Sequence, residues 1–320
     1  MNKKNQILLS IVIPTYERPH VLNSTLECLL NQIEYINNEI EIIVVDNGSK
    51  TYNILEIFSS KKFERFNFFR NEENLGIDGN VKKCIEYSNG NFVWLLSDDD
   101  LLYPNSVKKI MNSLKQNLDR GLFVLNYDVY DEKCENIIYR NIVNKDLNDD
   151  STVISQLTFI SINIINKSLL DEKVDLNSFD KYLGTLYYHM SISIYLAAAS
   201  GYIFINTPFV KFRSSCSNLG GTLESALRPY LVFKEINNSK LSYRNDTFVK
   251  NNVLLYVKSK KLNNSLSKYD VISIIKLFGV TPKIMYILII YLCPSFICSL
   301  FIKARNLFTK FKVSGLTKRK

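Results

Sequence analysis

The chain has 320 residues, of which 46% are hydrophobic and 22% are charged. This composition excludes collagen-like, mucin-like and disordered chains, and the length allows one large domain or two average ones. The formal net charge is +9, but residues 271–320 hold nine Lys/Arg and no Asp/Glu, so residues 1–270 carry 31 basic and 31 acidic side chains. A neutral body with a basic tail argues against a nucleic-acid-binding face.

The six cysteines are scattered, and no pair has C-x-x-C spacing. The sequence therefore offers no zinc framework, and a chain of this size does not need disulfides. The apolar run after the basic N-terminus stops at Pro14 without a small-residue cleavage site, which argues against a signal peptide. We expect a reduced, cytoplasmic location.

Strand and helix patterns alternate over the first 130 residues. Continuous β-branched runs predict buried strands, and apolar residues at helical spacing predict helices. The expected strands are residues 7–13, 41–45, 66–69 and 92–96, and the expected helices are residues 20–33, 52–60 and 77–88, the last closed by the C-cap pair Asn89-Gly90. This alternation predicts βαβ units and an α/β fold with a mainly parallel sheet flanked by helices.

The middle of the chain continues with further apolar runs. We expect strands at residues 122–130, 137–139 and 202–212, a helix at 182–200 ended by Gly201, and a helical extension from about residue 225. The expected organisation is a catalytic domain at 1–220, a helical extension at 221–270 and a hydrophobic, basic tail at 271–320.

Three polar clusters fall where expected strands end, at residues 14–18, 46–49 and 97–100. Ligands of open α/β sheets bind at the carboxyl ends of the strands. Three consecutive aspartates at 98–100 repel one another unless a positive group neutralises them, and their hard oxygens suit Mg²⁺ or Mn²⁺ carrying a diphosphate. The alternative is an acidic solvated turn or helix N-cap; the three clusters together favour the site.

These segments resemble a known family. The runs SIVIPTYER at residues 10–18, IVVDNGS at 43–49, NLG at 74–76 and WLLSDDD at 94–100 are similar to those of the family 2 glycosyltransferases, which have the GT-A fold. The resemblance is close over about residues 7–110 and extends loosely to about residue 213. Residues 74–80 with 97–100 are similar to the abequosyltransferase-like branch, which builds bacterial surface polysaccharides.

The resemblance implies roles at the site. Thr15, Tyr16 and Glu17 would lie against the nucleotide, Asp46 would hold the base edge or ribose, and Asp98 would face the ribose. A Mn²⁺ or Mg²⁺ ion held by the aspartates would act as a Lewis acid on the departing diphosphate. The residues expected at the nucleotide-sugar donor are Pro14, Thr15, Tyr16, Glu17, Asp46, Asn47, Asp78, Asp98 and Arg213, and those expected at the metal are Asp98, Asp99 and Asp100. For Arg213 a solvated loop arginine is the alternative.

The catalytic base is where the chain departs from the family pattern. An inverting transferase needs a base for the acceptor hydroxyl, commonly a carboxylate, but His189 stands about where that carboxylate belongs. His189 is interpreted as the base, as a metal or diphosphate contact, or as a structural histidine. Asp180 is the carboxylate alternative.

Competing functions remain open from the sequence. A nucleotidyltransferase usually opens with a Gly-rich loop after its first strand, and residues 14–18 contain no glycine. A membrane-bound carbohydrate-binding protein that kept the fold and lost activity is the non-enzyme alternative. The Q-x-x-R-W motif of processive synthases is absent, because the single tryptophan is Trp94, so a single-addition enzyme is expected.

The tail predicts membrane association. Residues 284–302 contain nineteen residues without a charge, interrupted by Pro294 and flanked by cations. This pattern favours a shallow or re-entrant segment on the inner face of the cell membrane, with basic residues on anionic head groups; a core helix is the alternative. Such a location suits a lipid-linked saccharide acceptor.

Overall fold

The computed structural model describes residues 7–33, 37–52, 57, 64–141, 151–154, 156–214 and 232. All of them belong to one unit of the chain, made of residues 1–220 and 228–243. The expected helix at 52–60 lies largely outside the described residues, and the helical extension and the basic tail lie outside them apart from residue 232.

Four parallel strands form one half of the sheet, in the order β3-β2-β1-β4. Every residue of β2 and of β4 is buried, as expected for strands with helices on both faces. The four strands are β1 (Leu9–Thr15), β2 (Ile40–Asp46), β3 (Phe66–Arg70) and β4 (Phe92–Leu95).

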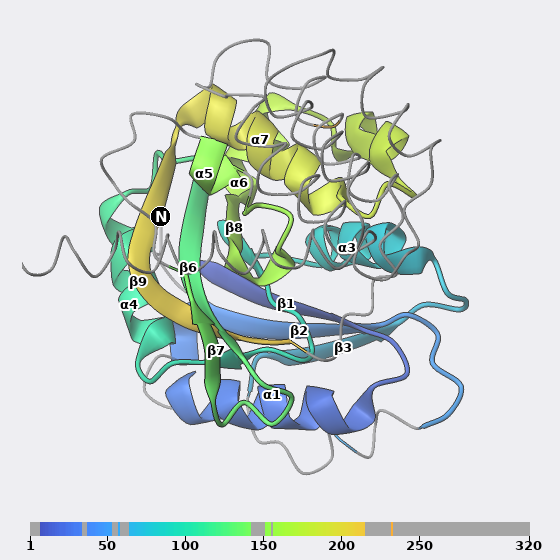
Figure 1. Cartoon of the computed structure of the whole chain (residues 1–320). Coiled ribbons are helices and arrows are strands. Elements are labelled where there is room, and N and C mark those ends of the chain that lie inside the picture. The colour runs from blue at the N-terminus through green and yellow to red at the C-terminus, as the bar shows by residue number, and fades with distance from the viewer. Residues whose placement is uncertain are drawn as a thin grey trace, which may run out of the picture. The chain divides into compact units, whose positions relative to one another are not determined.

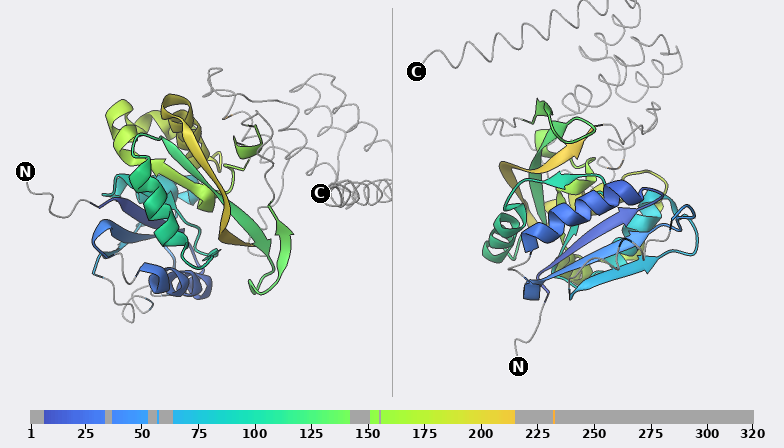
Figure 2. Two further views of the ribbon diagram at one scale, coloured as in Figure 1. Left: turned by 90° about the vertical axis from the view of Figure 1, so that its left-hand side faces the viewer. Right: turned by 90° about the horizontal axis from the view of Figure 1, so that it is seen from below.

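The helices of this half cover opposite faces of the sheet. Helix α1 (Pro19–Ile33) buries Leu22, Leu26 and Leu29 and lies on the face seen from below, whereas α3 (Gly76–Glu86) lies on the other face (Figures 1 and 2). Each helix connects two parallel strands, so the loops that follow β1, β2 and β4 lie at one edge.

The second half adds strands in both directions and makes the sheet mixed. Strand β8 is antiparallel to β4 and to β6, and β6 is parallel to β9. The added strands are β5 (Leu101–Leu102), β6 (Leu122–Tyr130), β7 (Ile137–Arg140), β8 (Asn163–Asn166) and β9 (Tyr202–Arg213). The β6–β7 hairpin extends from the sheet (Figure 2). The predicted α/β class with a mainly parallel sheet is confirmed.

Two of the remaining helices pack against elements already described. Helix α7 packs against β8 and α3, and α4 packs against α1. The remaining helices are α4 (Ser106–Gln116), α5 (Ser151–Ile154), α6 (Lys167–Lys173) and α7 (Tyr188–Ser200), with 3₁₀ helices η1 (Asn37–Glu39), η2 (Ile160–Ile162) and η3 (Leu176–Tyr182). The sequence patterns did not predict α4 or β8.

The first strand runs further than predicted. It was expected to stop at Pro14, but β1 continues to Thr15 and pairs with β2 along its whole length. On its other side, pairing with β4 ends at Val12 opposite Leu95. Pro14 therefore sits beyond the last paired position on that side, where its missing N–H removes no ladder hydrogen bond.

Two expected helix ends are also wrong. The helix expected at 182–200 begins only at Tyr188, because Gly184 and Leu186 have positive φ values of 80° and 72°, which no α-helix accommodates. The pair Asn89-Gly90 does not cap α3, which ends at Glu86 with Tyr87 as its cap. Asn89 instead donates its backbone N–H to Glu41 at 2.7 Å.

Candidate functional site

The acidic triplet directly follows β4 and is buried. Asp98 and Asp100 are 0% exposed and Asp99 is 7% exposed. The hydroxyl of Thr25 on α1 donates to the carbonyl oxygens of Asp98 at 2.9 Å and of Asp100 at 3.0 Å. This contact holds the backbone of the turn against α1, so the alternative of an acidic solvated turn does not describe these side chains.

The end of β1 and the loop after it supply the partners of Asp98. The Thr15 hydroxyl donates to Oδ2 of Asp98 at 2.7 Å. The guanidinium of Arg18 lies 2.5 Å from Oδ1 of Asp98 and 2.7 Å from Oδ2 of Asp99. One arginine thus offsets part of the repulsion between two neighbouring carboxylates.

The third aspartate is held from the other half of the sheet. Ser161 donates to Oδ2 of Asp100 at 2.5 Å, and the backbone N–H of Arg213 donates to Oδ1 at 3.2 Å. The Arg213 side chain donates through Nε to the carbonyl oxygen of Asp99 at 2.9 Å. The structure thus places Arg213 beside the triplet, where its side chain donates to the backbone carbonyl oxygens of Asp99 and Glu132.

Burial shifts the protonation of this cluster. It raises the pKa of Asp98 to about 7, against the lowering effect of Arg18, and the charge of Asp99 raises it further. Burial and the charge of Asp99 also raise the pKa of Asp100 well above its ordinary value. Carboxylates with such pKa values accept a cation readily, because the positive charge restores their ionised form.

The carboxylates of the triplet fit a divalent cation only in part. Among the described residues, no group of three or more His, Cys, Asp or Glu side chains is arranged to hold a metal ion. Diphosphate-bound Mg²⁺ usually takes only one or two protein carboxylates, with the rest of its shell from phosphates and water. Asp99 and Asp100 suit that smaller share, while Oδ1 of Asp98 accepts no well-directed hydrogen bond despite its ion pair with Arg18.

Hydrogen bonds join the loops that follow β1 and β2. Asp46 is 0% exposed and accepts from the Ser49 hydroxyl at 2.5 Å, and Arg70 lies 3.4 Å from its Oδ2. The Glu17 carboxylate accepts the backbone N–H of Lys50 at 2.6 Å. Hydrogen bonds from Thr51 and then from Lys50 lower the pKa of Glu17. The structure therefore uses Glu17 to join two loops.

Beside them, Tyr16 and Asn47 differ in accessibility. Tyr16 is 41% exposed, so its ring is open to a ligand. Asn47 is buried, donating to Asn74 Oδ1 at 2.8 Å and to the Gly76 carbonyl oxygen at 3.1 Å. Asn47 thus positions the turn before α3.

Asp78 was expected at the donor, but it contacts backbone instead. It lies in the first turn of α3 and accepts the N–H groups of Leu186 at 2.7 Å and Tyr188 at 3.1 Å. Burial raises its pKa, although backbone hydrogen bonds from Tyr188 and Leu186 oppose the shift.

His189 has the surroundings of a structural histidine. It is 3% exposed on α7, and its Nε2 lies 3.1 Å from the Leu157 carbonyl oxygen. Burial lowers its pKa to about 4, so it is neutral and faces the protein interior. This geometry supports the structural interpretation over those of base and metal contact.

Asp180 lies on η3, and its side chain is 41% exposed. Its carboxylate accepts from Lys82 Nζ on α3 at 2.7 and 2.8 Å. Of the two candidate bases, Asp180 is the one that is exposed to solvent.

Sequence reasoning assigned no role to Arg18, Ser49, Ser161 or Arg70. A signal existed for Arg18, since three adjacent buried aspartates require a nearby cation and Arg18 is the cation of the first strand-end cluster. Ser161 carried no such signal, because it is brought to Asp100 from 61 residues away.

None of the helices that the structure describes combines the length and the apolar character needed to cross a bilayer. The hydrophobic segment expected to reach a membrane lies outside this part of the chain.

Comparison with known proteins gives several similarities. The chain is 27% identical over 224 residues to abequosyltransferase RfbV of Salmonella typhimurium, covering 64% of this chain and 66% of that protein. It is 30% identical over 128 residues to an uncharacterized glycosyltransferase of Haemophilus influenzae, covering 40% of each. It thus spans less than two thirds of the length of these relatives.

Solved structures share the fold at low sequence identity. Staphylococcus aureus TarS 1–349 in complex with UDP-GlcNAc matches with a TM-score of 0.56 at 13% identity, over 88% of this chain and 79% of that one. Mannosyltransferase PcManGT from Pyrobaculum calidifontis, in complex with GDP-Man and Mn²⁺, matches with a TM-score of 0.52 at 12% identity, over 87% and 77%. The family model described as Glycosyl transferase family 2 matches residues 10–174, just over half of the chain. With its GT-A architecture and its aspartates at the carboxyl edge of the sheet, the chain belongs to glycosyl transferase family 2.

Proposed function

We propose that this chain transfers one sugar residue from a nucleotide-diphosphate sugar to a hydroxyl group of a saccharide acceptor. The observation that carries the proposal is the buried triplet Asp98–Asp100 at the sheet edge, joined to the β1 loop through Thr15 and Arg18. A nucleotide sugar presents ribose hydroxyls and a diphosphate, which suit carboxylates and a cation respectively.

In this proposal, different residues contact the nucleotide and the metal ion. Tyr16 packs on the base through its exposed ring, and Asp46 and Asp98 lie on the base and ribose side. Asp99 and Asp100 would hold Mn²⁺ or Mg²⁺, which when bound supplies a Lewis acid for the charge of the departing diphosphate. Two proteins that share the fold bind such ligands: TarS binds UDP-GlcNAc, and PcManGT binds GDP-Man and Mn²⁺.

We assign the base of an inverting reaction to Asp180. The bond between the sugar's anomeric carbon and the diphosphate oxygen breaks, the bond to the acceptor oxygen forms, and the acceptor proton passes to the Asp180 carboxylate. The nucleoside diphosphate leaves. Asp180 is partly exposed, whereas His189 is buried and hydrogen-bonded.

The acceptor is proposed to be a lipid-linked saccharide of bacterial surface polysaccharide synthesis, reached from the inner face of the membrane. Two observations support it: the similarity to an abequosyltransferase, and the basic, apolar sequence of residues 271–320. The tail would confine the enzyme to the plane in which such an acceptor resides.

One observation favours a second function, the binding of carbohydrate without catalysis. The neutral, buried His189 occupies the place where the family commonly has a carboxylate base. Such a protein would bind nucleotide sugar and release no nucleotide from it.

Nucleotide release tests both functions. The full chain is incubated with UDP-GlcNAc, UDP-glucose or GDP-mannose, with Mn²⁺ or with EDTA, and free UDP or GDP is measured. We expect Mn²⁺-dependent release from at least one donor, lost in Asp98→Ala and kept in Asp131→Ala, whose parent carboxylate lies in the β6–β7 turn. Binding of a donor without release would favour the binding protein, and release that persists in EDTA would contradict the metal assignment.

A further inference from the structure

Residues 183–187, which join η3 to α7, are held by a carboxylate of another helix. Asp78 of α3 is 3% exposed, and its two oxygens accept the backbone N–H groups of Leu186 and Tyr188 at 2.7 and 3.1 Å. The first N–H groups of a helix have no partner within it. Asp78 therefore supplies from α3 an acceptor for the first N–H of α7 and another for the loop before it.

The backbone held in this way is one that the chain would not adopt freely. Gly184 has a φ of 80°, which glycine adopts at little cost. Leu186, however, has a φ of 72°, and a residue with a side chain rarely adopts this left-handed region. Burying a carboxylate is also costly. Two unfavourable features coincide at this segment, which is typical of positions constrained for function.

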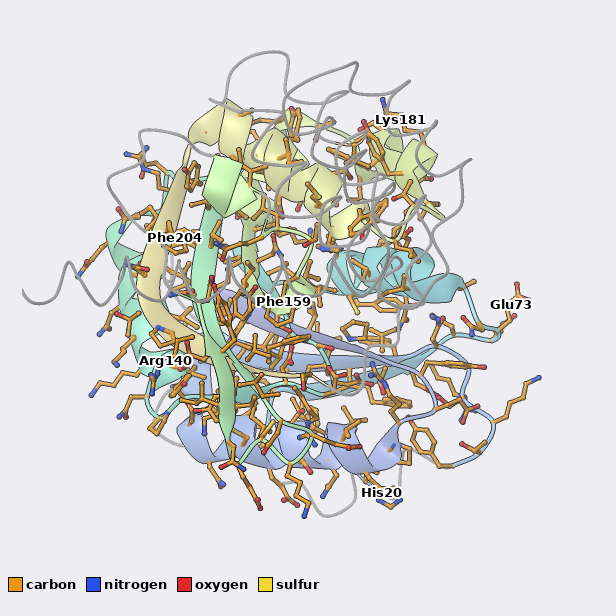
Figure 3. All side chains as sticks on the ribbon, in the orientation of Figure 1. His20, Glu73, Arg140, Phe159, Lys181 and Phe204 are labelled. Atoms are coloured by element: carbon orange, nitrogen blue, oxygen red, sulfur yellow. The ribbon has the colours of Figure 1, made fainter. Side chains whose placement is uncertain are left out.

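The segment is also tied to the edge of the sheet that carries the candidate site. Asn47, which follows β2, accepts the Leu75 N–H at 3.0 Å and donates to the Gly76 carbonyl oxygen at 3.1 Å. These contacts set the start of α3, and Asp78 sets residues 183–187 from there. Figure 3 labels Glu73, which precedes α3, and Lys181, which lies on η3.

The same helix holds the candidate base. Lys82, one turn after Asp78, binds Asp180 at 2.7 Å and Asn177 at 2.8 Å on η3. A base must touch the acceptor hydroxyl, whereas the groups assigned to the nucleotide come from the loops after β1, β2 and β4. The segment that α3 positions therefore belongs to the acceptor side.

We propose that Asp78 is a positioning residue of the transfer reaction, which holds residues 183–187 as the wall that receives the acceptor sugar and does not bind the nucleotide. The inference rests on the proposed glycosyl transfer. Orienting the acceptor lowers the barrier of transfer without strengthening donor binding, so the loss of Asp78 reduces kcat for transfer and leaves nucleotide affinity unchanged.

The test compares Asp78→Asn with the wild-type chain. The matched control is Asp175→Asn, whose parent carboxylate accepts a backbone N–H within η3, from Asn177 at 3.0 Å. Three quantities are measured: hydrogen exchange of the amides of residues 184–188, UDP affinity with Mn²⁺, and the ratio of transfer to octyl glycosides over hydrolysis of the same donor by water. Water needs no oriented acceptor, so hydrolysis serves as the internal reference.

For Asp78→Asn we expect exchange at Leu186 and Tyr188 to accelerate at least about tenfold, UDP affinity to stay within about twofold, and the transfer ratio to fall by about 10- to 100-fold. Asp175→Asn should match the wild type in all three. If Asp78→Asn does not fold, Asp78→Ser, which keeps one acceptor oxygen, replaces it.

Three results would overturn the inference: unchanged exchange at residues 186 and 188, an unchanged ratio of transfer to hydrolysis, or a loss of UDP affinity without a change in exchange, which would return Asp78 to the donor site. If the octyl glycosides accept no sugar, exchange and UDP affinity decide. Failure of the wild type to release nucleotide from any donor counts against the proposed function alone, because exchange still reports whether Asp78 holds the segment.

Discussion

At the scale of single side chains, burial changes the pKa values of Asp98 and Asp100 more than the neighbouring cations do. Arg18 contacts Asp98 and Asp99, yet burial still raises the pKa of Asp98 to about 7. Within the part of the chain that the structure describes, Asp100 is held by neutral groups, the Ser161 hydroxyl and the Arg213 backbone N–H. The triplet is thus short of positive charge, which is what a ligand carrying a cation would provide.

Replacing Asp100 with asparagine tests whether the triplet binds a cation. Asp100→Asn should lower nucleotide release by at least about 10²-fold, because a hard anionic ligand is lost at the diphosphate. Its melting temperature should stay equal or rise, since a buried charge has been removed. Release at saturating Mn²⁺ and thermal denaturation measure the two effects, with Asp131→Asn as control. Near-wild-type release, insensitive to EDTA, would contradict the assignment.

His189 predicts a dependence of stability on pH. Burial lowers its pKa to about 4 from the ordinary histidine value of 6.5, so between these pH values the unfolded chain binds more protons than the folded one. Stability is therefore full above about pH 6.5 and falls toward pH 4, by up to about 3 kcal/mol from this residue.

The measurement is denaturant unfolding between pH 4 and 7. His189→Gln should flatten the slope, whereas His20→Gln should not, because His20 is exposed at the start of α1 (Figure 3). We expect His189→Gln to keep nucleotide release within about threefold of wild type at pH 7. A fall of about 10² or more with unchanged stability would restore His189 as the base.

At the scale of elements, the backbone of β6 packs closely against the backbone of helix α7. Strand β6 begins after Gly121, where an added Cβ would lie 2.3 Å from the Leu196 carbonyl oxygen of α7. No side chain fits there without moving backbone. Gly184 differs, since its φ is positive but nothing lies within 4 Å of an added Cβ.

These two glycines give a paired prediction. Gly121→Ala should destabilise the protein by about 3 kcal/mol, because α7 must move from β6. Gly184→Ala should cost only about 1–2 kcal/mol, the penalty of a left-handed alanine. Urea unfolding measures both, and equal losses would show that the close packing of β6 against α7 is not the larger constraint.

At the scale of the whole molecule, the excess of positive charge lies at one end of the chain. Residues 271–320 hold nine cations and no anion, and each cation near an anionic surface can add about 1 kcal/mol of binding. The described residues carry the candidate site, and the proposed membrane contact would come from this tail.

Vesicle binding tests the tail. The full chain should sediment with vesicles containing about 30% phosphatidylglycerol, and much less with pure phosphatidylcholine, because the attraction depends on anionic lipid. Replacing Lys310, Lys312, Lys318, Arg319 and Lys320 with glutamine should weaken sedimentation, whereas replacing Lys108, Lys109 and Lys115 of α4 should not. A full chain that remains in the supernatant with both vesicles would refute membrane association.

How far the sequence predicted the fold is seen in particular elements. Strand β2 and helix α1 were located within about two residues, because burial on both faces or on one stripe leaves a local pattern. Helix α7 was misplaced at its start, because its first turn depends on Asp78, more than a hundred residues earlier. Strand β8 was missed, since four residues between β4 and β6 carry little local signal.

The sequence alone determined the α/β class, the family and the position of the aspartates at a strand end, since each depends on residues that are neighbours in the chain. Only the tertiary structure decided what those residues face: Arg18 and Thr15 on Asp98, Ser161 on Asp100, and His189 in the interior. It also turned Asp78 away from the expected donor contact and onto α7. The physical reason is that partners and burial arise from long-range packing, and these set the charge of a side chain and its access to a ligand.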